Sequence, residues 1–429
     1  MKNFLLSLFC LFASISTAQI YIPFDTSDYN QKITFIQKYN ESNKLFINQV
    51  KENYKRKISN RIEAYLKYYS ENLIAEIKES HFVFDERFTS KVNEILNEFK
   101  KHNSQIPHNT HIVVSKNPAL NAFCLPDGTF IINMGLFYYL KNEDQIASVI
   151  AHEISHKILE HYIKIQIQSI ENELLDESKI KIKEIEHVKY KKSEKAFELY
   201  KSMLYAKGDI QKNQEYQADS LGYILLKNTK YNRLNYIEML KLIEEHQKLK
   251  PKGLKKEIYR KMFDLPNQKF KEDWLRIEDF SSYEYSYKEK FNEDSLSTHP
   301  ETKNRIKRLE TLFPELKNPI LNVEDENFKI LKSISEYQQV ISLQSFEEYG
   351  LSTYICLYRL QENKNQEFYK SILGKNFIKI YESKKQYKLN RYIDRIDPRN
   401  HSESYIQFLS FIWNLKLDEI KLIMEYYNL

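Results

Sequence analysis

The stretch SVIAHEISHKILEH, residues 148–161, contains two histidines four residues apart, with a glutamate directly after the first. Its apolar residues recur with helical spacing, so we expect one helix. Positions i and i+4 of a helix share a face and lie about 6 Å apart, so the imidazoles of His152 and His156 can converge on one tetrahedral cation. Glu153 is offset by about 100° and can reach a water on that cation without binding the metal. The spacing predicts two zinc ligands and a general base.

A third ligand must come from elsewhere in the chain. The long metzincin motif needs glycine at position 159 and histidine at position 162, where this chain has Leu159 and Tyr162, so that form is excluded. Glu215 is the alternative, because Asp219 follows it by one helical turn and could accept the second ring N–H of a ligand histidine. An isolated helix glutamate is usually a solvated surface residue, so on the residues alone that interpretation of Glu215 stays open.

Four segments, in order, resemble the HtpX/CAAX-prenyl-protease family of zinc metallopeptidases. They are NAFCLPDGTFIINMGL at 121–136, NEDQIASVIAHEISH at 142–156, EYQAD at 215–219 and THPETKNRI at 298–306. The resemblance covers about residues 85–310. The chain is most similar to the soluble, exported members, periplasmic proteases that tend outer-membrane protein assembly, because it lacks the spanning helices of the members that act on prenylated substrates.

This resemblance implies a role for each matching residue. It implies one Zn²⁺ per chain, held by His152, His156 and Glu215. Glu153 matches the family's catalytic base, and Asp219 matches its supporting aspartate. The metal would lower the pKa of a bound water and polarise the scissile carbonyl.

Two further residues match the family near the end of the resemblance. His299, in a His-Pro segment, is expected near the metal, where it would either stabilise the oxyanion or close the site, and we favour closing. The local sequence alone would also allow His299 to neighbour a helix cap, with Pro300 in the first turn. Arg305 matches the arginine that follows. His161 comes only five residues after His156, too close to share the metal, and we interpret it as structural.

The N-terminus has the pattern of an export signal. An apolar run after Lys2 ends at a small-residue cleavage site, Ser16-Thr17-Ala18. We therefore expect a signal peptide at residues 1–18 and a periplasmic or secreted mature protein. The run is short for a spanning helix, and no later stretch approaches the roughly 18 apolar residues that a membrane span needs.

Composition favours a helical protein. The chain of 429 residues has 42% hydrophobic and 29% charged residues, with only 7 glycines and 10 prolines. Its net charge of +6 is interleaved with acids and forms no basic stripe, which excludes a nucleic-acid binder. Strands are expected at HIVVSK, residues 111–116, and in a hairpin turning at Pro126-Asp127-Gly128. We expect the helical region to break at Gly208 and residues 250–298 to be irregular.

The expected fold class is α+β and mostly helical. A gluzincin metallopeptidase domain should carry a small β-hairpin sheet beside the His-Glu-x-x-His helix, flanked by N-terminal helices and a C-terminal all-helical region. The predicted boundaries are a signal peptide at 1–18, an N-terminal helical segment at 19–84, the peptidase domain at 85–312 and the C-terminal region at 313–429.

These observations predict a zinc-dependent metalloendopeptidase. Its substrates would be unfolded or misassembled proteins, envelope or outer-membrane proteins among them, and we expect no nucleic-acid partner. The alternative is a non-catalytic chaperone or binding protein, whose helical regions bind clients and whose zinc site is latent or structural. The presence of Glu153 favours the enzyme, because a purely structural zinc site needs no general base.

Overall fold

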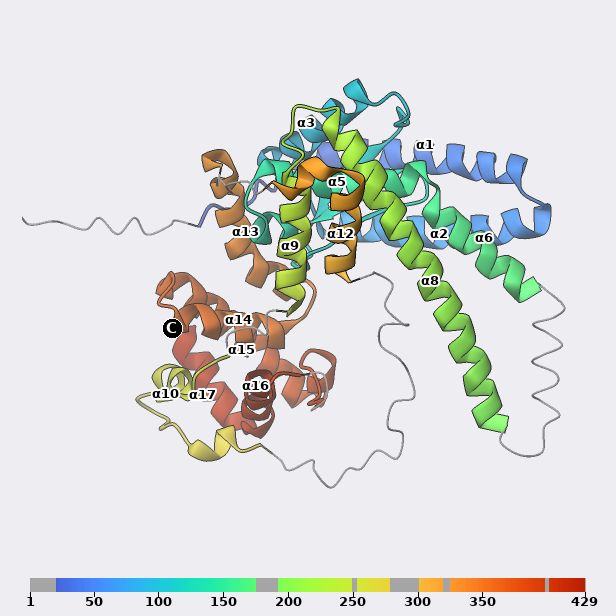
Figure 1. The fold of residues 1–429 in the computed structure, drawn as a ribbon. Coiled ribbons are helices and arrows are strands. Elements are labelled where there is room, and N and C mark those ends of the chain that lie inside the picture. Colours follow the sequence, from blue (N-terminus) through green and yellow to red (C-terminus); the bar gives the residue numbers. More distant parts are fainter. Residues whose placement is uncertain are drawn as a thin grey trace, which may run out of the picture.

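Helices make up most of the molecule, and one small sheet lies beside the helix that carries the two histidines (Figure 1). The computed structural model describes residues 21–174, 192–248, 253–277, 301–318, 325–397 and 401–428. The expected signal peptide lies outside these ranges. Within them, no helix has the length and apolar character needed to cross a membrane. The mostly helical α+β class predicted from the sequence is confirmed.

The sheet has four strands in the order β1-β2-β4-β3. They are β1 (Phe82–Val83), β2 (His111–Ser115), β3 (Ala122–Cys124) and β4 (Thr129–Asn133). β2 and β4 run parallel, and the other two pairs are antiparallel. The predicted hairpin is confirmed: β3 and β4 pair across a turn in which Gly128 has φ of 98°, which glycine adopts at no steric cost. β3 is therefore an edge strand.

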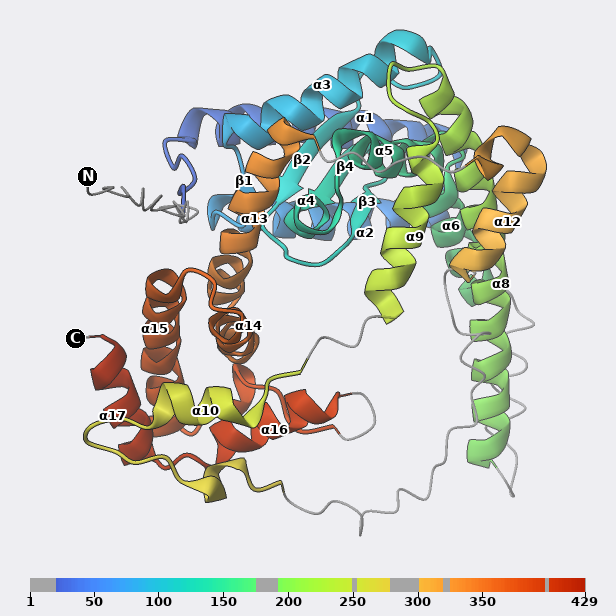
Figure 2. The ribbon, with the colours of Figure 1, turned by 60° about the vertical axis from the view of Figure 1, so that its left-hand side comes forward.

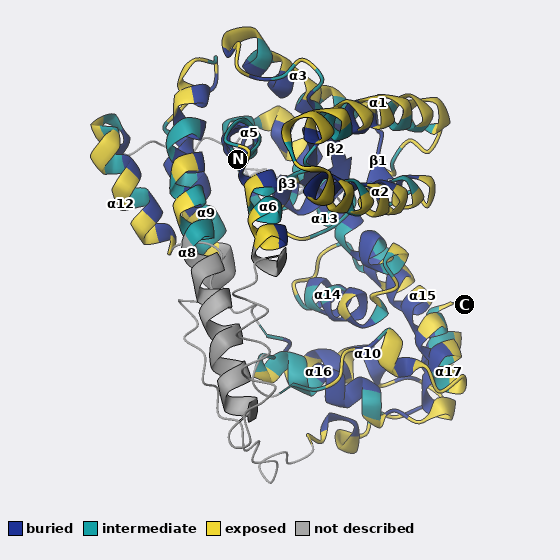
Figure 3. Ribbon diagram, turned by 90° about the vertical axis from the view of Figure 1, so that its right-hand side faces the viewer, coloured by how far each residue is buried: buried dark blue, intermediate teal, exposed yellow. Residues whose placement is uncertain are grey.

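Helix α5 (Glu143–Ile158) packs beside β3, and ten of its 16 residues are buried (Figure 3). The Asn142 side chain caps it by accepting a hydrogen bond from the backbone N–H of Gln145 at 3.0 Å. After Ile158 the chain reverses at Glu160, which has φ of 56°. The next helix, α6 (His161–Leu174), starts immediately after this turn.

Two later helices, α8 (Lys192–Lys227) and α9 (Asn235–Lys248), pack against α5 (Figure 2). α8 continues through Gly208, so the predicted break there is wrong. A glycine inside a helix costs only about 1 kcal/mol relative to alanine. The C-terminal part of α8 lies along α5 and buries Tyr223, Leu225 and Leu226, and this tertiary packing outweighs the local preference.

The N-terminal segment at 19–84 contains two helices, and a third helix begins the predicted peptidase domain. They are α1 (Tyr29–Asn53), α2 (Arg56–Lys78) and α3 (Glu86–His102). α1 and α2 pack against each other, and α2 also contacts α6 through Ile62 and Leu66. α3 packs on β2 with a strongly amphipathic face that buries Phe88 and Phe99. Two of the cleft-lining residues described below, Phe46 and Gln49, come from α1.

A second hydrophobic core lies among the C-terminal helices. These are α14 (Tyr349–Gln361), α15 (Gln366–Lys385), α16 (Glu403–Asn414) and α17 (Leu417–Tyr427), with the short η3 (Leu389–Arg391). α10 (Lys256–Phe263) and η1 (Glu272–Leu275) join this core, burying Phe263 and Trp274 in it. They come from within the 85–312 segment of the chain, and the expectation of an irregular structure there is wrong for α10.

Of the remaining helices, one connects the two cores and the others belong to the first core. α4 (Met134–Tyr139) and α12 (Thr302–Leu312), followed by η2 (Pro314–Lys317), belong to the first core. α13 (Glu326–Ser345) contributes to both. Its first half buries Phe328 and Ile334 in the first core, and its second half buries Tyr337 and Val340 in the second. One continuous helix therefore holds the two cores together.

The contact of α5 with α8 depends on small side chains. A Cβ atom added to Gly222 would lie 3.2 Å from the carbonyl oxygen of Ala151 and 2.8 Å from the hydroxyl of Tyr236. Ala218, one turn earlier on α8, is fully buried. Ala151, which precedes the first motif histidine, therefore packs directly on the backbone of α8.

We expect Gly222→Ala to destabilise the protein by about 1–3 kcal/mol, because the added methyl group overpacks this contact. Chemical unfolding followed by circular dichroism measures the change. Ile224→Ala, on the exposed face of α8, serves as the control and should have a smaller effect. An unchanged unfolding midpoint for Gly222→Ala would show that the two helices have room between them.

Candidate metal centre

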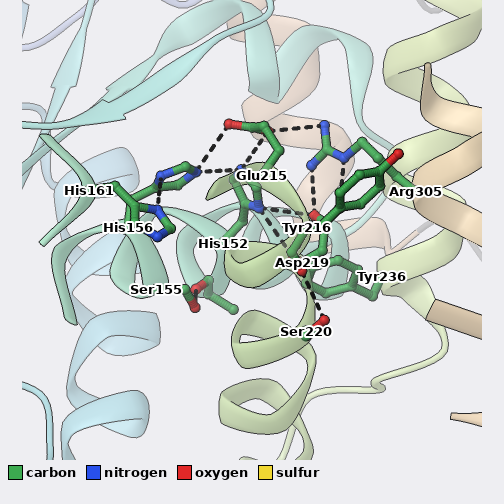
Figure 4. Close-up of polar contacts among 11 residues, drawn as sticks. His152, Ser155, His156, His161, Glu215, Tyr216, Asp219, Ser220, Tyr236 and Arg305 are labelled. Atoms are coloured by element: carbon green, nitrogen blue, oxygen red, sulfur yellow. Dashed lines mark hydrogen bonds and ion pairs between the residues drawn. The ribbon is translucent and has the colours of Figure 1, made fainter. Parts of the chain in front are cut away.

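Three candidate ligands meet where α5 contacts α8 (Figure 4). His152 and His156 project from successive turns of α5, and Glu215 projects from α8. The two Nε2 atoms of the histidines are 3.1 Å apart. Glu215 places Oε2 at 3.4 Å from Nε2 of His152 and Oε1 at 3.3 Å from Nε2 of His156. The structure brings together the three residues that the sequence proposed as ligands.

The separations of these atoms fit a zinc ion. Zinc binds nitrogen at about 2.0–2.1 Å, so tetrahedral geometry places neighbouring ligand atoms about 3.3–3.4 Å apart. The separation of the two Nε2 atoms, 3.1 Å, is close to this value, and each Nε2 lies 3.3 or 3.4 Å from a different oxygen of the Glu215 carboxylate. Two imidazoles and one carboxylate also form a ligand set of catalytic zinc, which leaves the fourth position for water or substrate.

Asp219 and Arg305 lie behind His152. Asp219 Oδ1 is 3.1 Å from Nδ1 of His152, and a carboxylate there keeps the ring hydrogen on Nδ1 and leaves Nε2 free for a metal. Arg305, on α12, donates two hydrogen bonds to Asp219 at 2.6 and 2.7 Å. Tyr236, on α9, donates to the same carboxylate at 3.3 Å. Four helices thus meet around one imidazole.

The charges at this point favour a cation. Burial lowers the pKa of His152, but its hydrogen bonds with Asp219 and Glu215 outweigh burial and raise the pKa to about 10. Burial raises the pKa of Asp219, but the nearby Arg305 guanidinium outweighs it and lowers the pKa to about 2. The two carboxylates therefore stabilise positive charge where the Nε2 atoms converge.

Two cavities meet at the site. One, of about 560 Å³, is lined by residues of β3, α6 and α1, and the other, of about 690 Å³, is lined by residues of β3, α9 and α12. His152, Glu153 and Glu215 line both. Glu153 lines both cavities and is not part of the ligand cluster. This position agrees with the role that the motif predicts for it.

Sequence reasoning missed three polar contacts of the site. His161 Nδ1 lies 3.0 Å from Nδ1 of His156, and its Nε2 lies 3.0 Å from Oε1 of Gln217. Tyr236 is the third, and no local pattern marks it, because it follows Asp219 by 17 residues on another helix. Burial lowers the pKa of His161 to about 4, so the ring is neutral at pH 7. The predicted site residue His299 lies outside the described residues.

We expect Arg305→Met to destabilise the metal-free protein by about 3–5 kcal/mol at pH 7, because it removes the guanidinium that pairs with buried Asp219. The loss should shrink as the pH falls. The depressed pKa of Asp219 stabilises the native protein above the unfolded value near 4, and that stabilisation is lost toward pH 2 in the parent, whereas the variant has less of it to lose. Urea unfolding of the metal-free proteins at pH 7 and pH 3 tests this. Lys307→Met, an exposed change on the same helix, is the control. Equal losses at both pH values would contradict it.

Three curated proteins resemble short parts of the chain. The mitochondrial metalloendopeptidase OMA1 of Arabidopsis thaliana is 38% identical over 50 residues, covering 12% of this chain and 10% of that protein. The beta-barrel assembly-enhancing proteases of Yersinia pestis and Escherichia coli (strain K12) are 32% identical over 79 residues and 34% identical over 77, each covering 18% of this chain and 16% of the relative. The chain thus spans less than a fifth of the length of these relatives.

A family model covers far more of the sequence. The model described as "Peptidase family M48" matches residues 86–312. This range is more than half of the 429 residues and contains the three candidate ligands, Glu153, and the Asp219 and Arg305 pair. The site geometry and the family match agree on the same residues. The chain belongs to peptidase family M48, a family of zinc metallopeptidases.

Proposed function

We propose that this metallopeptidase is an endopeptidase that binds one zinc ion through His152, His156 and Glu215 and cleaves extended segments of unfolded or misassembled proteins. The observation that carries the proposal is the ligand triangle at the junction of two cavities, with Glu153 lining both. A cleft that continues on both sides of the catalytic groups accommodates chain on both sides of a scissile bond, as an endopeptidase requires.

Each residue has a distinct part in this proposal. Zinc bound there would supply Lewis-acid chemistry. Glu153 takes a proton from the attacking water and delivers it to the leaving amine. Asp219 and Tyr236 hold His152 in the orientation that presents Nε2 to the ligand triangle. Arg305 keeps Asp219 ionised by pairing with it.

Strand β3 is the proposed docking site for the substrate backbone. Asn133 N–H bonds the carbonyl of Asn121, and Leu125 N–H bonds the carbonyl of Thr129, so alternate residues of β3 face β4. Ala122 and Cys124 lie between them and direct their backbone groups to the open edge. A substrate segment can pair with this edge as an added strand only when it is extended, which favours unfolded chains over folded domains.

The compartment and the natural clients are also part of the proposal. The N-terminal export pattern favours the periplasm, with secretion as the second choice. The name of two relatives, beta-barrel assembly-enhancing protease, suggests envelope or outer-membrane proteins as substrates here as well. The C-terminal helices, which have a core of their own, are the proposed client-binding region.

One prediction of the proposed function concerns the metal. We expect the purified protein to hold one zinc per chain and Glu215→Ala to lose most of it, because three protein ligands become two. Elemental analysis after dialysis measures the occupancy. Glu171→Ala removes an exposed glutamate on α6 and should keep the zinc. Full occupancy in Glu215→Ala would move the third ligand to another residue.

The second prediction concerns catalysis. Glu153→Gln should retain zinc and fold but lose activity on unfolded casein by on the order of 10²-fold or more, because the general base is gone. Glu171→Gln, an exposed change on α6 outside the cleft, is the control and should keep activity. Chelator should abolish cleavage by the parent protein. A parent that leaves casein intact while preventing its aggregation would favour the chaperone alternative, and cleavage by Glu153→Gln at the parent rate would remove Glu153 from the mechanism.

A further inference from the structure

His156 and His152 have different partners behind their rings. His152 has the Asp219 carboxylate, which Arg305 pairs. His156 has a second imidazole: its Nδ1 lies 3.0 Å from Nδ1 of His161, and the two ring centroids are 4.9 Å apart. Within the described residues the partner at Nδ1 of His156 is this imidazole and not a carboxylate, so a different mechanism must determine which of its nitrogens carries the hydrogen.

The hydrogen bonds of His161 show, by elimination, which nitrogen of His156 carries the ring hydrogen. The carboxamide oxygen of Gln217 only accepts, so Nε2 of His161, 3.0 Å away, carries a hydrogen and donates it. A neutral imidazole with its hydrogen on Nε2 has a lone pair on Nδ1. Because the two Nδ1 atoms are at hydrogen-bonding distance, His156 must be the donor there. Its Nε2 is then the atom with the lone pair, and that atom faces Glu215 and His152.

The chain reversal after α5 makes this contact possible. In a continuous helix, five residues correspond to about 500° of rotation, which would turn His161 some 140° away from His156. Glu160 instead adopts φ of 56°, a left-handed conformation that costs a non-glycine residue roughly 1–2 kcal/mol. The turn returns the chain so that His161, the first residue of α6, packs its ring under His156 (Figure 4). His161 itself is only 3% exposed.

We propose that His161 and Gln217 are positioning residues that act through His156: the relay from His156 Nδ1–H to His161 and from His161 Nε2–H to Gln217 fixes the tautomer and orientation in which His156 binds zinc. The inference rests on the proposed metal site and extends it beyond the three ligands. The partner of His156 is an imidazole, whereas the partner of His152 is a carboxylate paired with Arg305, so the two ligand imidazoles are held by different chemistry.

Gln217 offers the cleaner test, because its side chain is exposed and its replacement does not disturb the core. We expect Gln217→Met to weaken zinc binding by about 3- to 10-fold, since the residue acts through a second ring. Gln217→Glu preserves an acceptor and should bind zinc at least as tightly as the parent. Gln214→Met and Gln214→Glu make the same changes nearby on α8, and they control for lost polarity and added charge. Competition with a chromogenic chelator measures each dissociation constant.

His161 itself provides the second test. His161→Phe keeps a ring of similar size but no acceptor, and we expect zinc binding to weaken about 10- to 100-fold. His161→Asn restores an acceptor oxygen near the position of Nδ1 and should recover much of this loss. Thermal unfolding of the metal-free variants separates a folding defect from a binding defect. If His161 were purely structural, His161→Phe would instead bind zinc more tightly than His161→Asn.

Two outcomes would overturn the proposal. One is unchanged zinc affinity in both His161→Phe and Gln217→Met. The other is equal weakening in Gln217→Met and Gln217→Glu, which would show that the acceptor is irrelevant. The failure of this inference is distinguishable from failure of the proposed function. If Glu215→Ala loses zinc while the His161 and Gln217 variants keep it, the ligand set stands and the relay does not.

Discussion

The direct packing of α5 on the backbone of α8 determines where every group of the site can lie. The α8 residues that face α5 at this contact, Gly222 and Ala218, have side chains too small to hold the helices apart. Glu215, on the same helix as these two, consequently reaches within 3.4 Å of both ligand histidines. A thicker layer of side chains would separate the carboxylate from the imidazoles by more than a zinc ion can span. The small side chains at this contact are therefore as necessary for the site as the His-Glu-x-x-His motif.

Around this contact, pairing with an arginine offsets the cost of burying the carboxylates. Asp219 is nearly inaccessible, and a lone carboxylate in that position would take up a proton rather than remain charged. The Arg305 guanidinium prevents this, so the acceptor behind His152 stays ionised. Arg305 also lies 3.4 Å from Glu215, so one cation stabilises both carboxylates of the site. Its position on α12 makes that helix part of the metal centre although it supplies no ligand.

The sequence predicted what depends on local geometry. His152, Glu153 and His156 follow from the rotation of one helix, which is the same in any protein. Glu215 needed the family resemblance, since its spacing to Asp219 is common on solvated helices. The β-hairpin was predictable because a turn residue and strand formers are adjacent in the chain.

Most of the missed features depend on contacts between distant segments. Gly208 was expected to end a helix, but the packing of the later half of α8 overrides this local preference. Tyr236 and Gln217 reach the site from positions that no periodic pattern distinguishes. The left-handed turn at Glu160 lies in a charged stretch without glycine, so nothing indicated that His161 would fold back on His156.

The path of the chain between the two cores has a consequence for biogenesis. The guanidinium of Arg305 lies 86 residues beyond the carboxylate it pairs, and α10 and η1 of the second core are synthesised between them. During vectorial synthesis the N-terminal elements emerge first, so the helices with both histidines and both carboxylates precede their neutralising cation. Long sequence separations of this kind slow folding. The pair of Asp219 with Arg305 can therefore form only after more than two thirds of the chain has been synthesised, so the orientation of His152 is not secured before then.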